Sequence, residues 1–376
     1  EDGNVSKKND GARRVRLGPS MDWDPSEAAT QTYGVIARKG GGKTYLAGKL
    51  VEQLLSVGCP CIVLDPVGNW FGLRLSADGR SPGFPIVVLG GLQGDVGLEP
   101  HQGDAVARFV IRSNASAVVD VSGMLKGQQK RFVADFCEAL LHEAKSARSV
   151  RMIVFEEAQE FAPQQSHGQE RMLGAVQSIV RLGRNFGLGS MLLSQRPQSV
   201  SKEVLNQAGV LFVGQLTGAH ERKAIKEWVL AQGEDLKEQL GSLAALSSGD
   251  FFHWSPQWQR DFRKVRASKK DTLDASRTLR LDEGMVKNWS PEGLKAGGGI
   301  DLEALKVALD VGGTGSKRQT AAAAEKASGL GLRASGSEKN SGSGAEARSQ
   351  KPEAARPSEA ELLLPWRQWV GQLRAE

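Results

Sequence analysis

The stretch Tyr33–Leu50, YGVIARKGGGKTYLAGKL, decides the fold of this chain. It begins within a short apolar run, Thr32–Ile36, that predicts a β-strand, and from Tyr45 it has apolar residues at helical spacing. A glycine-rich turn between a strand and a helix directs successive backbone N–H groups into one concavity, next to the positive end of the helix dipole. The stretch therefore predicts a phosphate-binding loop.

The residues of this loop are expected to bind ATP, and two of them have an expected individual role. The expected nucleotide-binding residues are Ala37, Arg38, Lys39, Gly40, Gly41, Gly42, Lys43, Thr44 and Tyr45. Lys43 is expected to reach the β- and γ-phosphates, and the Thr44 hydroxyl to ligate Mg²⁺. The sequence departs from G-x-x-x-x-G-K-[ST] at Ala37, which tolerates a positive φ less well than glycine. The alternative, a chance Lys-Thr pair after a glycine-rich turn, is disfavoured by the flanking strand and helix.

Length and composition set limits on the class of protein. The 376 residues suffice for two to three average domains or for one large α/β domain with extensions, and the net charge of +6 weakly favours a polyanionic partner. The cysteines Cys59, Cys61 and Cys137 have no matching Cys or His pair, which favours buried thiols in a reducing compartment over a metal site. No apolar run is long enough to cross a membrane and no signal peptide is visible, so we expect a cytoplasmic protein without membrane contact.

Strands and helices are expected to alternate along the core. Alternation of this kind predicts βαβ units and an α/β fold with a mostly parallel central sheet, covered by helices on both faces. A terminal hairpin is expected from Asp250–Trp254 and Phe262–Val265. The expected strands before it are Thr32–Ile36, Cys61–Asp65, Ile86–Leu89, Ser116–Val121, Arg151–Phe155, Leu188–Ser194 and Val210–Leu216.

The chain divides into five expected segments: a polar N-terminal arm (1–28), a core (29–267), a C-terminal extension (268–311), a disordered linker (312–360) and an apolar, aromatic tail (361–376). The linker is rich in Gly, Ser, Ala and charge, and cannot bury enough apolar surface to fold. The tail, which contains Trp366 and Trp369, is either a tethered peptide that binds a partner or an unstructured end.

Two acids follow the apolar strand Arg151–Phe155. The carboxyl ends of parallel strands form the edge where ligands bind in open α/β sheets, so Glu156 and Glu157 are expected beside the phosphate loop. We assign Glu156 to holding Mg²⁺ and Glu157 to polarising the water that attacks the γ-phosphate. Asp is the common residue at the first position, so the extra methylene of Glu156 is a second departure. The alternative is an exposed Glu-Glu pair that opens a loop.

Gln195 and one of two arginines complete the predicted catalytic set. Gln195 lies at the end of the strand Leu188–Ser194, where an amide can sense the γ-phosphate or hold the attacking water. Arg181 and Arg184 lie near the end of the preceding helix, and an arginine supplied across a subunit boundary can stabilise the charge of phosphoryl transfer. We favour Arg184, because the break at Gly187 would present it at an edge. The alternative for either arginine is a solvated helix face.

Taken together, these motifs resemble the HerA/FtsK superfamily of ring-forming ATPases, and more narrowly the HerA-like proteins with a DUF87-type helicase core. The resemblance runs in collinear order from about Gln31 to Val265. The stretches that carry it are ARKGGGKTYLAGKLVEQL, CIVLDPVGNWFGLR, PIVVLGGLQGDVGLEP, VVDVSGMLKGQQKRFVADFCEAL, MIVFEEAQEFAP, RLGRNFGLGSMLLSQRPQSVSKEVLNQ and LTGAHERKAIKEWV.

The resemblance implies a P-loop NTPase with a RecA-like three-layer α/β/α core, a hexamer with ATP at its subunit boundaries, and double-stranded DNA in the central channel. Lys43, Thr44, Glu156, Glu157, Gln195 and Arg184 fall on functional positions of the family. Well-studied members carry an N-terminal β-barrel that docks a nuclease partner. Fewer than about thirty residues precede the first core strand here, too few for a barrel, so we expect none.

Two functions remain open at this point. The first is a DNA-translocating ATPase motor, for which basic residues would contact phosphates unless they are ordinary solvated charges. The second is a nucleotide-gated assembly or switch ATPase that recruits a protein partner, such as a nuclease or a defence effector. A metabolic kinase is disfavoured, since a glutamine strand beside paired acids suits attack by water. The candidate basic residues are Lys202, Arg222, Lys223, Lys226, Lys269 and Lys270.

Overall fold

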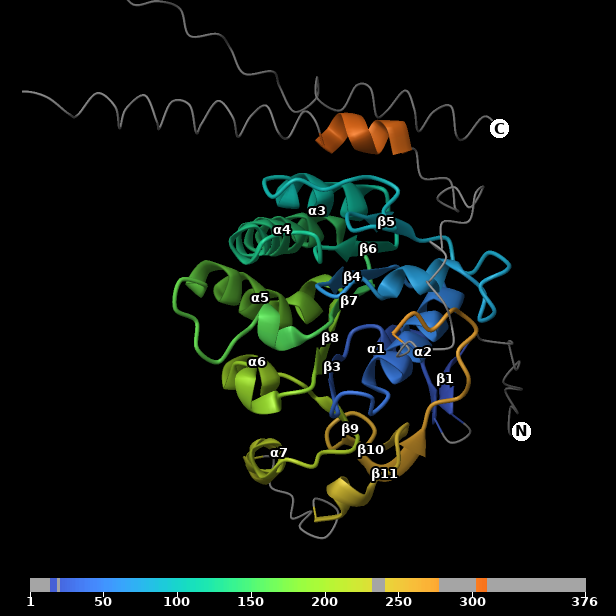
Figure 1. Ribbon diagram of the computed structural model, residues 1–376, viewed down its shortest axis with the longest axis vertical. Coiled ribbons are helices and arrows are strands. Elements are labelled where there is room, and N and C mark those ends of the chain that lie inside the picture. Colours follow the sequence, from blue (N-terminus) through green and yellow to red (C-terminus); the bar gives the residue numbers. More distant parts are fainter. Residues whose placement is uncertain (1–13, 19–20, 232–240, 277–301, 310–376) are drawn as a thin grey trace, which may run out of the picture. The chain divides into compact units, whose positions relative to one another are not determined.

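The computed structural model describes residues 14–18, 21–231, 241–276 and 302–309 (Figure 1). The predicted linker (312–360) and tail (361–376) lie outside these residues, as does most of the predicted extension beyond residue 276. A short helix spans residues 302–309 within the predicted extension and buries Leu305 and Leu309. Among the residues described, no helix is both long and apolar enough to cross a membrane.

A nine-stranded sheet forms the centre of the fold, in the order β11-β10-β9-β3-β8-β7-β4-β6-β5. Strands β3 to β9 run parallel, and β10 joins antiparallel to β9 and β11. Their bounds are β3 Thr32–Ile36, β4 Cys61–Asp65, β5 Val87–Leu89, β6 Ala117–Asp120, β7 Arg151–Phe155, β8 Leu188–Ser194, β9 Val210–Val213, β10 Asp250–Ser255 and β11 Asp261–Arg266. Six of the seven parallel strands are buried throughout, as a sheet covered on both faces requires.

Helices cover both faces of the sheet because successive strand residues point to opposite sides. Val35 of β3 belongs to one apolar core and its neighbour Ile36 to the other. The first core includes α1 (Pro25–Ala28) and α2 (Lys43–Ser56). The second includes α3 (Gly103–Arg112), α4 (Lys126–Ala147), α5 (Glu170–Leu182), α6 (Lys202–Leu205) and α7 (Ala219–Ala231). The predicted three-layer α/β fold with a mostly parallel sheet is confirmed (Figure 1).

The N-terminal segment differs from a polar arm. Val15–Gly18 (β1) and Met21–Trp23 (β2) pair as an antiparallel hairpin. Its alternate apolar residues are buried against α2, and Arg16 donates its backbone N–H to the Gln53 side chain at 3.0 Å. The period-two pattern of V-R-L and M-D-W is the sequence signal for this hairpin, which the polar composition of the surrounding residues obscures.

Residues 268–276, here called the strap, leave β11 and lie along α2. The buried carboxylate of Glu52 on α2 accepts hydrogen bonds from the backbone N–H of Asp271 and Thr272 and from the Thr272 hydroxyl. The phenol oxygen of Tyr45 accepts from the N–H of Lys270 at 2.9 Å. On the other side, Leu273 donates its N–H to the carbonyl of Leu75. The first part of the predicted extension is therefore bound to the helix that follows the phosphate loop.

Candidate nucleotide-binding site

The glycine-rich loop has the backbone that its sequence predicts. Positive φ values fall on Gly40 (72°) and on Gly42 (91°), the residue before α2. Ala37 is not among the residues with positive φ; it is fully buried under the loop, 2.9 Å from where a Cβ of Gly41 would be. The departure at Ala37 therefore costs the loop no backbone strain. It also means that Ala37 supports the loop from below, whereas Arg38 to Tyr45 line the cavity above.

A second segment forms the outer wall of the loop. Ser248 donates its hydroxyl to the carbonyl of Gly40 at 2.7 Å, and the N–H of Gly249 bonds to the carbonyl of Gly41 at 3.1 Å. The left-handed φ of Gly42 favours glycine there, and a Cβ on it would also make a tight contact of 3.2 Å with the Cα of Gly249. Sequence analysis did not identify Ser248 or Gly249, which lie about two hundred residues after the loop.

The two acids at the end of β7 meet Lys43. Its Nζ lies 2.8 Å from Oε1 of Glu156 and 2.8 Å from Oε1 of Glu157. Consecutive residues of a strand point to opposite faces, yet these two carboxylates reach the same amine. The reason is the left-handed backbone of Glu157, with φ 50° and ψ 60°, which ends the strand and turns the second side chain toward the loop. Non-glycine residues adopt this conformation uncommonly, in turns and at functional sites.

The charges of this group are strongly coupled. Burial disfavours the ammonium ion of Lys43, but the two carboxylates outweigh burial and raise its pKa above the ordinary value. Burial would raise the pKa of Glu157, but Lys43 and the hydrogen bonds from Gln159 and Gln195 lower it. Glu157 therefore remains a carboxylate, able to accept a proton, across the neutral range.

The donor set fits a magnesium ion that is also held by phosphates. The Thr44 hydroxyl lies 3.1 Å from Oε1 of Glu156, and hydroxyl and carboxylate oxygens are ligands that Mg²⁺ prefers. In the part of the chain that the structure describes, no three His, Cys, Asp or Glu side chains form a metal-binding group. Mg²⁺ is commonly held by one or two protein oxygens together with substrate phosphates, so Thr44 and Glu156 suit a metal that arrives with the nucleotide.

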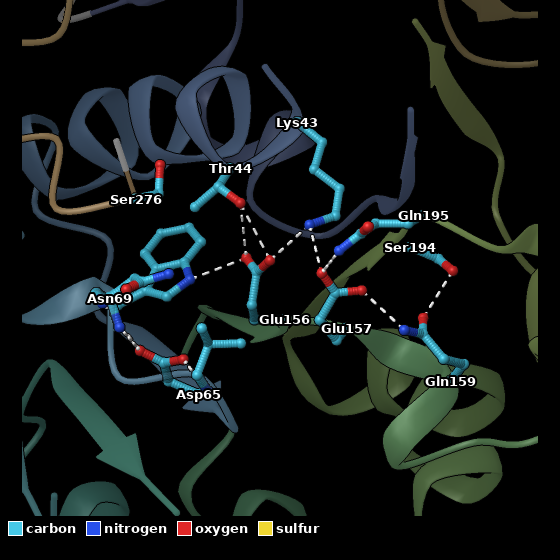
Figure 2. Close-up of polar contacts among 12 residues, drawn as sticks. Lys43, Thr44, Asp65, Asn69, Glu156, Glu157, Gln159, Ser194, Gln195 and Ser276 are labelled. Carbon is cyan, nitrogen blue, oxygen red and sulfur yellow. Dashed lines mark hydrogen bonds and ion pairs between the residues drawn. The ribbon is translucent and has the colours of Figure 1, made fainter. Parts of the chain in front are cut away.

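A network of amides surrounds Glu157 (Figure 2). Gln195, directly after β8, donates its side-chain N–H to Oε1 of Glu157. Gln159 donates to Oε2 at 2.8 Å, while its own carbonyl accepts from the hydroxyl of Ser194 at 2.8 Å. The structure thus brings Lys43, Thr44, Glu156, Glu157 and Gln195 together, as predicted from three separate stretches of sequence. Sequence analysis assigned no role to Gln159, although it lies in the E-A-Q run after the acids.

These side chains line an open cavity of about 1160 Å³, large enough for a nucleoside triphosphate. Its walls come from the phosphate loop, the acids, the segment after β8 and the Ser248–Gly249 turn. Arg38 and Arg196 also line it, as do Asp274 and Ser276 at the end of the strap. The strap therefore reaches the rim of the cavity.

Arg184 does not join this group. It lies in the short 3₁₀ turn Gly183–Phe186, is exposed, and does not line the cavity. Gln195 follows the last residue of β8 whereas Arg184 precedes the first, so roughly 20 Å or more of strand separates them. Arg184 cannot reach the site of its own chain, and the same holds for Arg181 on α5.

The loop after β4 adds two residues that sequence analysis missed. The carboxylate of Asp65 accepts the backbone N–H groups of Val67, Gly68, Asn69 and Trp70, at 2.7 to 2.9 Å. Burial raises the pKa of Asp65 to about 6, although these hydrogen bonds oppose that change. Trp70 begins the 3₁₀ turn Trp70–Arg74, and its indole Nε1 donates to Oε2 of Glu156 at 3.0 Å. The signal in the sequence was the D-P-V-G-N-W run after a buried strand.

The structure corrects part of the candidate basic surface. Lys270 belongs to the strap, packs against Gly48 and the ring of Tyr45, and its pKa is lowered by burial. It is therefore not a surface contact for phosphates. Lys202 and Lys223 share Glu227, at 3.5 and 3.9 Å, which reduces the positive charge they offer.

A mostly parallel sheet with a glycine-rich loop, a Lys-Thr pair, paired acids and a glutamine on neighbouring strand ends defines a P-loop NTPase of the RecA-like class. Comparison with solved structures agrees. The bacterial conjugative coupling protein TrwB superposes with a TM-score of 0.50 at 11 % identity, covering 70 % of this chain and 90 % of that chain. At this identity the likeness shows the fold alone.

Sequence comparison finds similarity over part of the chain. Residues 22–147 match the family model described as "Helicase HerA, central domain". A probable helicase of Methanocaldococcus jannaschii is 37 % identical over 91 residues, and the DNA double-strand break repair helicase HerA of Pyrococcus furiosus is 30 % identical over 101. These matches cover 24 % and 26 % of this chain and 17 % of each relative's length. Residues 22–147 of this chain are therefore similar to the central domain of HerA helicases, and the chain spans less than a fifth of the length of these two relatives.

Proposed function

We propose that this chain is an ATP-hydrolysing ring motor of the HerA/FtsK type that binds and translocates double-stranded DNA. The observation that carries the proposal is the convergence of Lys43, Glu156, Glu157 and Gln195 beside the phosphate loop. Support for DNA comes from the relatives, whose names describe helicases and a DNA double-strand break repair helicase.

The residues divide the work of hydrolysis among them. Lys43 would exchange its two carboxylate partners for the β- and γ-phosphates, which carry similar charge. Thr44 and Glu156 would hold Mg²⁺, which offsets phosphate charge when it is bound with ATP. Glu157 would orient a water molecule and accept its proton, and Gln195 would hold that water or contact the γ-phosphate.

A ring of several chains would bring an arginine from one subunit to the cavity of the next. Arg184 is exposed and remote from its own cavity, so any role in catalysis requires a second copy of the chain. A head-to-tail arrangement places the same surface of each subunit against the site of the next and closes into a ring when the rotation permits. We propose a hexamer with ATP at each subunit boundary, as the superfamily resemblance implies.

One experiment separates the motor from a nucleotide-gated switch. ATP hydrolysis is measured with and without duplex DNA at two salt concentrations, with Lys43→Ala as the control for contaminating ATPase. A motor should hydrolyse faster with duplex, and the stimulation should weaken as salt rises. A rate of hydrolysis that is the same with and without DNA would contradict translocation. It would favour the alternative, an assembly ATPase that recruits a protein partner. Full activity of Lys43→Ala would overturn the proposal in both forms.

A further inference from the structure

The proposed metal-binding acid, Glu156, has a third side-chain partner that the proposed reaction does not use. Oε1 of Glu156 faces Lys43 and Thr44, at 2.8 and 3.1 Å. Oε2 accepts the indole N–H of Trp70 at 3.0 Å and lies 3.3 Å from the Thr44 hydroxyl. Both Trp70 and Glu156 are only 3 % exposed, so water does not compete well for this hydrogen bond.

Trp70 is held in place independently of Glu156. Its backbone N–H bonds to Oδ2 of Asp65 at 2.9 Å, and the same carboxylate binds the three residues before it. Gly68 provides the positive φ of 84° that this tight turn requires. After the turn, Leu75 is tied to the strap through the N–H of Leu273. The indole is thus a fixed donor rather than a side chain that follows the carboxylate.

We propose that Trp70 is a positioning residue that holds Glu156 in the orientation needed for the metal. Glutamate has one more rotatable bond than aspartate, the common residue at this position, and the indole N–H removes that freedom by fixing Oε2. When Lys43 turns to the phosphates, Glu156 loses its ammonium partner, and the Trp70 indole and the Thr44 hydroxyl are the side-chain contacts that remain. Oε1 then stays directed at Thr44. This inference rests on the proposed function.

The test compares two tryptophan variants that lose the same kind of bond. Trp70→Phe keeps an aromatic ring but removes the N–H. Trp258→Phe is the matched control, because its indole also donates to a glutamate, Glu27, at 2.9 Å, but its partner does not line the cavity. ATP binding is measured by calorimetry with Mg²⁺ and with EDTA, using Glu157→Gln as the background to prevent turnover.

In Trp70→Phe we expect the Mg²⁺-dependent part of ATP affinity to fall on the order of 10-fold, as for other residues that orient metal ligands. Binding in EDTA should stay within about twofold of the parent, and Trp258→Phe should match the parent in both conditions. Unchanged Mg²⁺ dependence in Trp70→Phe, or an equal loss with and without Mg²⁺, would overturn the inference. A parent protein that binds no ATP at all would instead overturn the proposed function.

A spectroscopic measurement covers the case in which Trp70→Phe does not fold. The chain has eight tryptophans, whose indole N–H resonances can be observed in ¹⁵N-labelled protein. Glu156→Gln should shift the Trp70 resonance more than any other, and Mg²⁺ added to the ATP-bound wild-type protein should shift the same resonance. Spectra in which Glu156→Gln moves no indole resonance would show that the hydrogen bond does not form, and the inference would fail.

Discussion

Glu157 reaches Nζ of Lys43 at 2.8 Å only because its own backbone is left-handed, with φ 50°. In an extended conformation its side chain would point to the opposite face from Glu156. The strained backbone of Glu157 therefore places its own side chain, the expected catalytic base, beside the phosphate loop.

Replacement of Glu157 by glutamine should separate binding from hydrolysis. Glu157→Gln keeps the shape of the side chain and one acceptor oxygen, which can still accept from Gln195, but it cannot accept a proton, so we expect hydrolysis to fall at least about 100-fold. ATP affinity should stay within a few fold, measured by calorimetry. Glu170→Gln, at an exposed position on α5, is the control. Retained hydrolysis in Glu157→Gln would assign the base to another group.

Replacement of Lys43 by alanine should reverse a pH dependence. In the wild type the lowered pKa of Glu157 contributes stability that is present above the ordinary pKa of glutamate and is lost as pH falls through the folded-state pKa. In Lys43→Ala two buried acids lie together without a cation, so one pKa rises, and this contribution is lost instead as pH rises.

Denaturant unfolding from pH 4 to pH 8 measures that difference. Relative to wild type, Lys43→Ala should lose more stability at pH 8 than at pH 4, by about 3 kcal/mol, the usual cost of removing one partner of a buried ion pair. Lys39→Ala, an exposed lysine of the same loop, should follow the wild-type curve. A constant deficit at all pH values would show that the acids do not depend on Lys43.

Two inactive variants should restore activity to each other if Arg184 acts across a subunit boundary. Arg184→Ala keeps an intact cavity, and Glu157→Gln keeps an intact arginine. In a mixed ring, some interfaces join the cavity of an Arg184→Ala subunit to the arginine of a Glu157→Gln subunit. Such an interface has every catalytic residue. An equal mixture should therefore recover up to about a quarter of the wild-type rate. No recovery would argue against Arg184, and the same mixture with Arg181→Ala tests the alternative.

Removal of the Glu52 carboxylate should release the strap. Glu52 is fully buried and accepts from two backbone N–H groups and one hydroxyl of Asp271 and Thr272. Glu52→Ala leaves these donors without a partner, so we expect a loss of about 3 kcal/mol and faster hydrogen exchange at both amides. Glu138→Ala, which breaks an exposed ion pair with Arg171, should cost less than about 1 kcal/mol. Equal effects of the two variants would contradict this role.

Sequence patterns predicted the sheet well because its strands are short apolar runs between clear turns. β3, β4, β7 and β8 have the predicted bounds, and β9 ends three residues earlier than expected. The three motif stretches that meet at the site were also predictable, since the carboxyl ends of parallel strands share one edge.

The contacts that support those motifs were not predictable. The wall made by Ser248 and Gly249, the strap on Glu52 and the indole of Trp70 all join residues that are distant in sequence. No periodicity or spacing in the sequence marks such pairs, because the two residues of each pair come together only in the folded chain. The hairpin at Val15–Trp23 was missed for a different reason: its alternation is only three or four residues long on each strand.

The wall at Gly249 has a practical consequence for anyone who divides this protein. A fragment that ends after α7 would contain the glycine loop, both acids and the glutamine, and every motif search would score it as whole. It would nevertheless lack the Ser248–Gly249 turn, which forms the outer wall of the loop. The Cα of Gly249 lies 3.2 Å from the position that a Cβ on Gly42 would take. Completeness of the motifs and completeness of the binding pocket are thus different properties of this sequence.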